Sequence, residues 1–149
     1  MATPQERLEA DVKTAMKARD KERLGTLRML LTDVKNEKIQ LGADVDESTF
    51  ITVVRRGIKR RRDAEKQYRD GNRPELADQE AREAVILEEY LPAQVDEATI
   101  RAAIEEVVAA ENLEGPRGMG PIMKAMKARF GDNADGATLS RLAREVLGS

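Results

Sequence analysis

The sequence contains neither cysteine nor histidine among its 149 residues. The absence of cysteine excludes disulfide bonds and thiolate metal sites. The absence of histidine removes the commonest general base, and with it the Ser–His and Cys–His pairs of nucleophilic catalysis. Carboxylate or lysine chemistry and carboxylate-bound Mg²⁺ stay open. We therefore expect a protein that binds a partner and has no catalytic residues, metal site or cofactor of its own.

Aromatic residues are also scarce, at 3% of the chain, whereas hydrophobic residues make up 40% and charged residues 36%. This composition is typical of amphipathic helices, because strands favour aromatic and β-branched side chains. No apolar run approaches the ~20 residues that span a bilayer, and residues 1–6 lack the apolar core of a signal peptide. The sequence predicts an all-α protein without membrane segments, located in the cytoplasm.

Cap and stop signals divide the N-terminal part of the chain into four helices. Thr3-Pro4 with Glu6 predicts a capping box with proline in the first turn. Gly42, the turn Asp70-Gly71-Asn72 and Pro92 supply helix ends. The expected helices run from Pro4 to about Ala18, from Asp20 to Leu41, from Asp46 to Arg69, and from Pro74 to Tyr90. Short connections favour antiparallel packing of these helices.

Three further helices are expected after Pro92. Asp96 is the N-cap of the fifth helix and Asp135 that of the last. The glycine-rich stretch Asn112–Gly120 is expected to be a loop, followed by a sixth helix over residues 121–130. The sequence thus predicts an N-terminal bundle of about four helices in residues 1–92 and a small three-helix bundle in residues 93–149.

The formal net charge of −2 provides no overall attraction for nucleic acid, so the distribution of charge matters more. One basic stripe in the third helix follows the spacing i, i+4, i+7, i+11, i+14, which places it on a single helical face. Its members are Arg55, Lys59, Arg62, Lys66 and Arg69. Asp63 and Glu65 lie off this stripe in the helical projection. It is either a solvated face offset by neighbouring acidic helices or a track for phosphates.

A second basic set lies on the last two helices. Its members are Lys124, Lys127, Arg129 and Arg141, with Arg144 beyond them. The simple interpretation is solvated side chains, some of them favourable to the helix dipole. Two acidic pairs, Glu88-Glu89 and Glu105-Glu106, are poor candidates for catalysis, because adjacent residues on a helix point about 100° apart.

Several segments, in order along nearly the whole chain, resemble the GatB/YqeY family. They are residues 17–24, 27–30 and 34–37, the basic run 59–63, Glu88-Glu89-Tyr90-Leu91-Pro92, Met119-Gly120-x-x-Met123-Lys124, and Ala134-Asp135-Gly136. The strongest resemblance is to stand-alone YqeY-like proteins. The resemblance implies two helical bundles, the second of them similar to the tail of the B subunit of the tRNA-dependent amidotransferase, which binds tRNA away from the active site.

Residue by residue, the resemblance extends to Gly120, Met123 and Lys124, which match the Gly-x-x-Met-Lys pattern of that tail. Asp135 departs from it, because the tail typically has Asn-Pro there. The resemblance implies tRNA or another structured RNA as the partner, bound by shape and backbone, with no readout of DNA sequence expected. Two alternatives stay open: a protein-interaction module that docks on an enzyme or translation factor, and a component of a glutamine-dependent amidotransferase.

Overall fold

The computed structural model describes residues 2–148. Within this range the chain forms seven α-helices and two short 3₁₀ helices, and no strand. The elements are α1 (Pro4–Lys17), α2 (Lys21–Leu41), α3 (Glu47–Asp70), α4 (Pro74–Glu88), α5 (Glu97–Glu111), η1 (Pro116–Gly118), α6 (Met119–Phe130), η2 (Gly131–Asn133) and α7 (Gly136–Leu147). The prediction of an all-α fold is confirmed.

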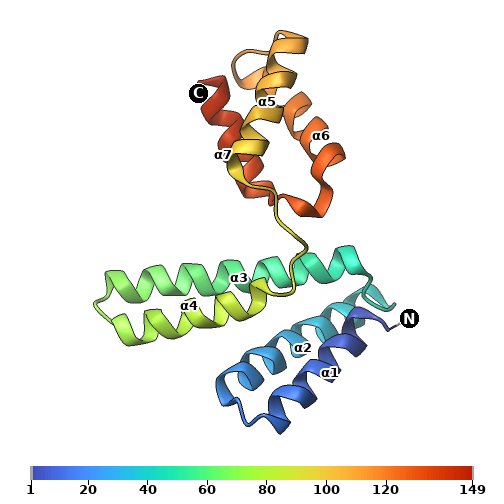
Figure 1. The fold of residues 1–149 in the computed structure, drawn as a ribbon, viewed down its shortest axis with the longest axis vertical. Coiled ribbons are helices and arrows are strands. Elements are labelled where there is room, and N and C mark those ends of the chain that lie inside the picture. The colour runs from blue at the N-terminus through green and yellow to red at the C-terminus, as the bar shows by residue number, and fades with distance from the viewer. Residues whose placement is uncertain (1, 149) are drawn as a thin grey trace. The chain divides into compact units, whose positions relative to one another are not determined.

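Contacts between helices divide the chain into two compact units, one ending at Leu91 and the other beginning at Pro92. Helices α1–α4 belong to the first unit and α5–α7 to the second, as Figure 1 shows. Each unit has a hydrophobic core of its own.

In the first unit, α1 packs against α2 and α3 packs against α4. The two pairs meet over one core, whose fully buried members include Leu8, Leu27, Val54 and Leu87. Within each helix the buried residues recur at helical spacing, as Leu8, Val12 and Ala15 do in α1. Each helix therefore turns one apolar face inward and leaves most of its charged residues outside.

Tyr90 joins the end of α4 to this core. Its ring lies edge-on to Phe50 with 6.0 Å between centroids, and its hydroxyl donates a hydrogen bond to Asp11 at 2.6 Å. Burial, and then the Asp11 carboxylate, raise the pKa of Tyr90, so the phenol stays a neutral donor. Two of the four aromatic rings of the chain are therefore packed inside the first unit.

The second unit packs α5, α6 and α7 around aliphatic side chains. The largest fully buried ones are Ile100, Ile104, Ile122, Met126, Leu139 and Leu142. Gly118 is also buried. A Cβ at this position would lie only 2.8 Å from Cδ2 of Leu147, so no larger residue fits without a shift. Glycine at 118 thus lets η1 approach α7 closely.

The stretch Asn112–Gly120, expected to be a loop, is helical in its second half, so that prediction is wrong. The 3₁₀ helix η1 leads directly into α6, which begins at Met119, two residues before Pro121. Proline is accommodated there because the first N–H groups of a helix have no intrahelical acceptor. Asp135 occupies the N-cap position of α7, as expected, but its side chain accepts no cap hydrogen bond from a backbone N–H.

Asp46 and Asp96 act as side-chain N-caps, and their titration should make stability fall in acid. Their carboxylates accept the backbone N–H of Thr49 at 2.8 Å and of Thr99 at 2.7 Å. These bonds lower the pKa of both groups. Because the folded-state pKa lies below the unfolded value, the stabilisation is present above that value and is lost as pH falls through the folded pKa.

We therefore expect the melting temperature, followed by circular dichroism, to drop as pH is lowered through 4. The double variant Asp46→Asn with Asp96→Asn keeps a capping side chain that does not titrate. Its melting temperature should depend less steeply on pH over the same range, with a residual slope from Glu65 and Glu145, whose pKa values are also lowered by arginine partners. An unchanged slope in the variant would contradict this assignment.

Candidate nucleic-acid interface

The basic stripe of α3 is neutralised to a large extent by acidic residues of the same helix. Nζ of Lys59 lies 3.0 Å from Asp63. Glu65 lies 3.1 Å from Arg62 and 2.8 Å from Arg69. Asp63 and Glu65 lie off the stripe in the helical projection but still pair with its cations, because side chains three or four residues apart on a helix can meet.

Helix α4 supplies further partners to the stripe. Arg62 pairs with Glu88 at 2.9 Å, and Arg69 pairs with Asp78 at 3.1 Å. These contacts raise the pKa of both guanidinium groups. The largest cause is the hydrogen bond to Glu88 for Arg62 and the hydrogen bond to Glu65 for Arg69. Arg55 is half-buried and also has an interaction partner. Lys66 of the stripe makes no ion pair with a residue between 2 and 148. Through Arg62 and Arg69 the stripe forms ion pairs that connect α3 with α4.

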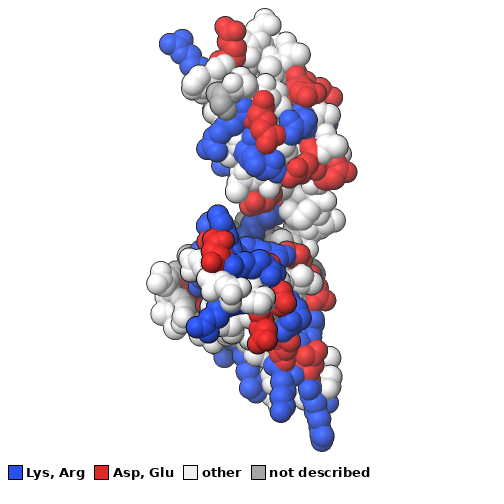
Figure 2. Space-filling model, turned by 90° about the vertical axis from the view of Figure 1, so that its left-hand side faces the viewer, with Lys and Arg blue, Asp and Glu red and all other residues white. Residues whose placement is uncertain are grey.

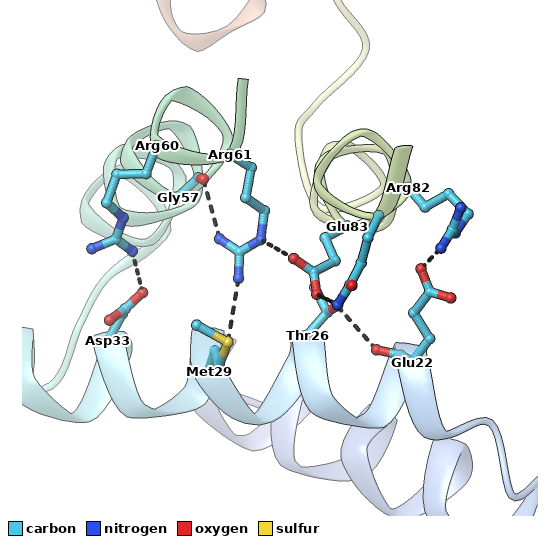
Figure 3. A network of polar contacts seen from close by, with 10 residues as sticks. Glu22, Thr26, Met29, Asp33, Gly57, Arg60, Arg61, Arg82 and Glu83 are labelled. Atoms are coloured by element: carbon cyan, nitrogen blue, oxygen red, sulfur yellow. Dashed lines mark hydrogen bonds and ion pairs between the residues drawn. The ribbon is translucent and has the colours of Figure 1, made fainter. Parts of the chain in front are cut away.

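Arg61, next to the stripe, is a buried structural residue at the junction of α2, α3 and α4 (Figure 3). Only 5% of it is exposed. Nη1 donates to the carbonyl of Gly57 at 3.2 Å, Nη2 faces the sulfur of Met29 at 3.7 Å, and Nε lies 3.5 Å from Glu83. The Nε contact is an ion pair without good hydrogen-bond geometry, since Nε has no hydrogen-bond partner among the described residues.

The second unit presents a different kind of cationic face. Arg117 in η1 and Lys124 and Lys127 in α6 recur one turn or two turns apart, with Gly120 between them, so the four residues lie along one side of the helix. All four are exposed. None of the three cations makes an ion pair with a residue between 2 and 148, and the first turn of α6 contains no acidic residue. We call these four residues the α6 face.

Gly120 at the centre of the α6 face is not required by the fold. A Cβ there would meet nothing within 4 Å, in contrast to Gly118 two residues earlier. Its φ is not positive, so no special backbone conformation demands glycine. Glycine within a helix costs about 1 kcal/mol relative to alanine. What glycine provides here is an open backbone that a ligand can approach closely.

The remaining predicted site residues of the second unit have structural partners. Arg129 pairs with Glu106 at 3.2 Å and lies over the ring of Phe130, 5.6 Å from its centroid. Arg141 pairs with Glu145 at 3.2 Å and also with Glu97. These two arginines hold helices together and have less charge to offer a partner.

Met123, from the family-like motif, is half-buried and packs against the core of the second unit. It therefore positions α6, whereas Gly120 and Lys124 of the same motif are exposed. Sequence reasoning missed Arg117, because it was placed in a loop. The signal that could have found it is its spacing of three and seven residues from Gly120 and Lys124.

The described residues also bear on two other features, a metal site and a membrane-spanning helix. No group of three acidic side chains in residues 2–148 is arranged so that it could hold a metal ion. No helix within that range is long and apolar enough to cross a membrane.

Comparison with known proteins places the chain among YqeY-like proteins, since the model of that family matches residues 5–147. A relative from Pyrenophora tritici-repentis is 27% identical over 96% of this chain and 80% of its own length. Relatives from Lachancea thermotolerans and Kluyveromyces lactis are 35% and 36% identical over 56% of this chain. These alignments span about half of the two yeast proteins, 46% and 45%.

All three relatives are named altered inheritance of mitochondria protein 41, mitochondrial. The expectation of a cytoplasmic location is contradicted by these names and is wrong. It rested on the absence of an export signal near the N-terminus, and the composition of a helical domain carries no information about its compartment.

Proposed function

Since the chain belongs to the family of YqeY-like proteins, we propose that it is a non-catalytic accessory protein that binds tRNA or another structured RNA through the α6 face. The observation that carries the proposal is the contrast between the two basic sets. The stripe of α3 is largely paired with carboxylates, whereas Arg117, Lys124 and Lys127 have no described acidic partner. Cations without internal partners are the ones that release counterions when they contact phosphates.

The mode of binding follows from which aromatic rings are accessible. Phe50 and Tyr90 pack against each other in the first core, and the ring of Phe130 is covered by the guanidinium of Arg129. Recognition of single-stranded bases relies on stacking against such rings. The fourth ring, Tyr68, is half-buried. With so few rings available for stacking, we expect the RNA to be read through its phosphate backbone and its shape, which is how double-stranded regions are recognised.

The resemblance to the amidotransferase tail supports the same surface. Gly120 and Lys124, the exposed members of the Gly-x-x-Met-Lys pattern, lie side by side on the α6 face, one turn apart. The reading as an amidotransferase component rests on family analogy alone, because a shared fold does not supply an active site.

The proposal is tested by titrating a labelled tRNA with the full chain at low salt and following fluorescence anisotropy. A single-stranded RNA of equal length and charge is the comparator. We expect saturable binding of the tRNA with clear preference over the single strand. If neither RNA binds at low salt, RNA binding is excluded and the protein-interaction reading takes its place.

Substitution of Gly120 by alanine should separate stability from binding. Because the site is open and helical, Gly120→Ala should raise the free energy of unfolding by up to about 1 kcal/mol. The added methyl group should nevertheless weaken tRNA binding several-fold, because it obstructs the approach of the phosphate backbone. Thermal melting and tRNA anisotropy on the same samples measure both effects.

The matched control is Gly118→Ala, two residues away. Its Cβ would meet Leu147 at 2.8 Å, so overpacking should destabilise the second unit by about 1–3 kcal/mol. The tRNA affinity of the folded fraction should stay near that of the native chain. Equal affinity of Gly120→Ala and the native chain would remove the α6 backbone from the interface.

A groove of the first unit favours the protein-interaction alternative. It is lined by Ala81, Val85 and Ile86 of α4 and by residues at the start of α2. Val85 is 54% exposed there, and an apolar side chain in a groove with a charged rim is a usual feature of contact sites. Failure of the native chain to bind RNA would direct the search to this groove.

A further inference from the structure

The acidic residues of α2 that form ion pairs all lie toward α3 and α4. Three pairs connect the helices: Glu22 with Arg82 at 2.8 Å, Asp33 with Arg60 at 2.6 Å, and Glu37 with Arg56 at 3.4 Å. Figure 3 shows the first two of these pairs on either side of the buried Arg61. The charge of the long basic run of α3 is thus largely met by α2 as well as by α4.

The charged residues on the opposite side of α2 are all cations. Lys21, Arg28 and Lys35 follow one another at intervals of seven residues, so they lie within about 40° on the helical projection. All three are exposed, and none makes an ion pair with a residue that the structure describes. The last residue of α1, Lys17, and Arg19 in the turn that follows are also exposed and make no ion pair with a described residue.

Basic side chains gather visibly at this end of the first unit. In Figure 2 they project from its lowest part, where Figure 1 places the turn between α1 and α2. Few acidic side chains are seen among them in this view. This end of the first unit is therefore basic in the face that Figure 2 shows, although the basic and acidic residues of the unit are balanced in number.

Gly25 in the middle of this face has no structural reason to be glycine. It lies inside the 21-residue helix α2, its φ is not positive, and a Cβ would meet nothing within 4 Å. Lys21 precedes it by one turn and Arg28 follows it by one turn. Gly120 has the same surroundings on the α6 face, with Arg117 before it and Lys124 after it.

The left-handed backbone of Arg19, with φ 58°, belongs to the end of α1. The N–H of Asp20 donates to the carbonyl of Ala15 and the N–H of Arg19 donates to that of Met16, both at 3.1 Å. These two bonds are the usual way in which a helix ends with a left-handed residue. They fix the backbone at Arg19, whose side chain is exposed.

We propose that this surface is a second phosphate-binding site, which contacts the backbone of the same structured RNA. The α2 face consists of Lys17, Arg19, Lys21, Gly25, Arg28 and Lys35. The inference rests on the proposed function for the identity of the partner, and it assigns the contact of the first unit to α2 in place of the α3 stripe. Ile39, one turn after Lys35, is 77% exposed on this side of α2, but a single apolar side chain does not make the apolar face that a helix lying on a bilayer needs.

The test measures tRNA affinity over a salt series for the native chain, for Lys21→Glu with Arg28→Glu, and for Gly25→Ala. The double reversal should weaken binding on the order of tenfold or more and lower the log–log salt slope by nearly two. Gly25→Ala should weaken binding several-fold while raising the melting temperature. The matched control, Lys59→Glu with Lys66→Glu on α3, should bind within about twofold of the native chain.

The outcomes distinguish this inference from the proposed function. If Lys124→Glu with Lys127→Glu abolishes binding while the α2-face variants bind like the native chain, the α2 site is excluded and the α6 site stands. If no RNA binds to the native chain, the proposed function fails first. Sedimentation with phosphatidylcholine vesicles containing phosphatidylglycerol is the remaining arm. Binding to vesicles that needs Lys21 and Arg28, without binding to tRNA, would assign the face to a membrane surface and overturn the proposal.

Discussion

Replacing Arg61 with alanine should lower the free energy of unfolding of the first unit by about 3–5 kcal/mol. This guanidinium is 5% exposed and lies where α2, α3 and α4 meet. Its removal deletes the hydrogen bond to Gly57 and leaves Glu83, which is itself mostly buried, without its cation. The cost of an unpaired buried charge exceeds what the pair itself contributes, because the remaining carboxylate has lost its solvation and its partner together.

Arg60 is the matched control, since it is the next residue on the same helix and has a similar ion pair. Its partner is Asp33 at 2.6 Å, but 63% of the Arg60 side chain is exposed. Surface pairs contribute between about 0 and 1 kcal/mol, so Arg60→Ala should cost at most that much. Urea unfolding of both variants, followed by circular dichroism, gives the comparison. Equal costs for Arg60→Ala and Arg61→Ala would contradict the structural role of Arg61.

A double substitution separates the lost pair from the lost packing. Arg61→Met with Glu83→Leu removes both charges and keeps apolar volume in the junction. Because replacing a buried ion pair with apolar side chains is often neutral, most of the stability lost in Arg61→Ala should return. If the double variant is as unstable as Arg61→Ala, the cost is due to the cavity and not to the unpaired carboxylate.

The inward position of Arg61 could have been predicted from the sequence, but its partner could not. Arg61 follows Phe50, Val54 and Gly57 at the spacing of one helical face, and that face is buried. Its acidic partner Glu83 belongs to α4 and lies more than twenty residues away, so periodicity within α3 does not reveal it. Local signals did predict the helices themselves, since Thr3, Asp46 and Asp96 bind the backbone N–H groups that a cap must satisfy.

The same limit applies to the candidate site. The spacing of Arg55, Lys59, Arg62, Lys66 and Arg69 correctly predicts one helical face, but periodicity does not reveal that Asp78 and Glu88 reach this face from α4. A cation becomes available to a ligand only when no carboxylate of the fold reaches it. That property belongs to the packed structure, which is why Lys124 and Lys127 differ from Arg129 and Arg141 only once α5 and α7 are in place.

Reversing Lys124 and Lys127 to glutamate should reduce tRNA affinity by about 10- to 100-fold and lower the log–log salt slope by nearly two. Both ammonium groups are exposed and make no ion pair with the described residues. The reversal therefore breaks no contact of the fold, and the melting temperature should stay close to that of the native chain. Affinity measured by anisotropy between low and moderate salt gives the slope.

The comparison variant is Arg62→Glu with Lys66→Glu on the α3 stripe. Here the carboxylate introduced at 62 would face Glu88 and Glu65, so the change should destabilise the first unit. Its salt slope for tRNA should fall by one at most, because only Lys66 has charge to spare. We therefore expect opposite results for the two variants. The α6 variant should have a lower salt slope and unchanged stability, whereas the α3 variant should have lower stability and little change in salt slope. A fall of nearly two in the slope of the α3 variant alone would move the RNA to the stripe, since counterion release reports directly on which cations contact phosphate.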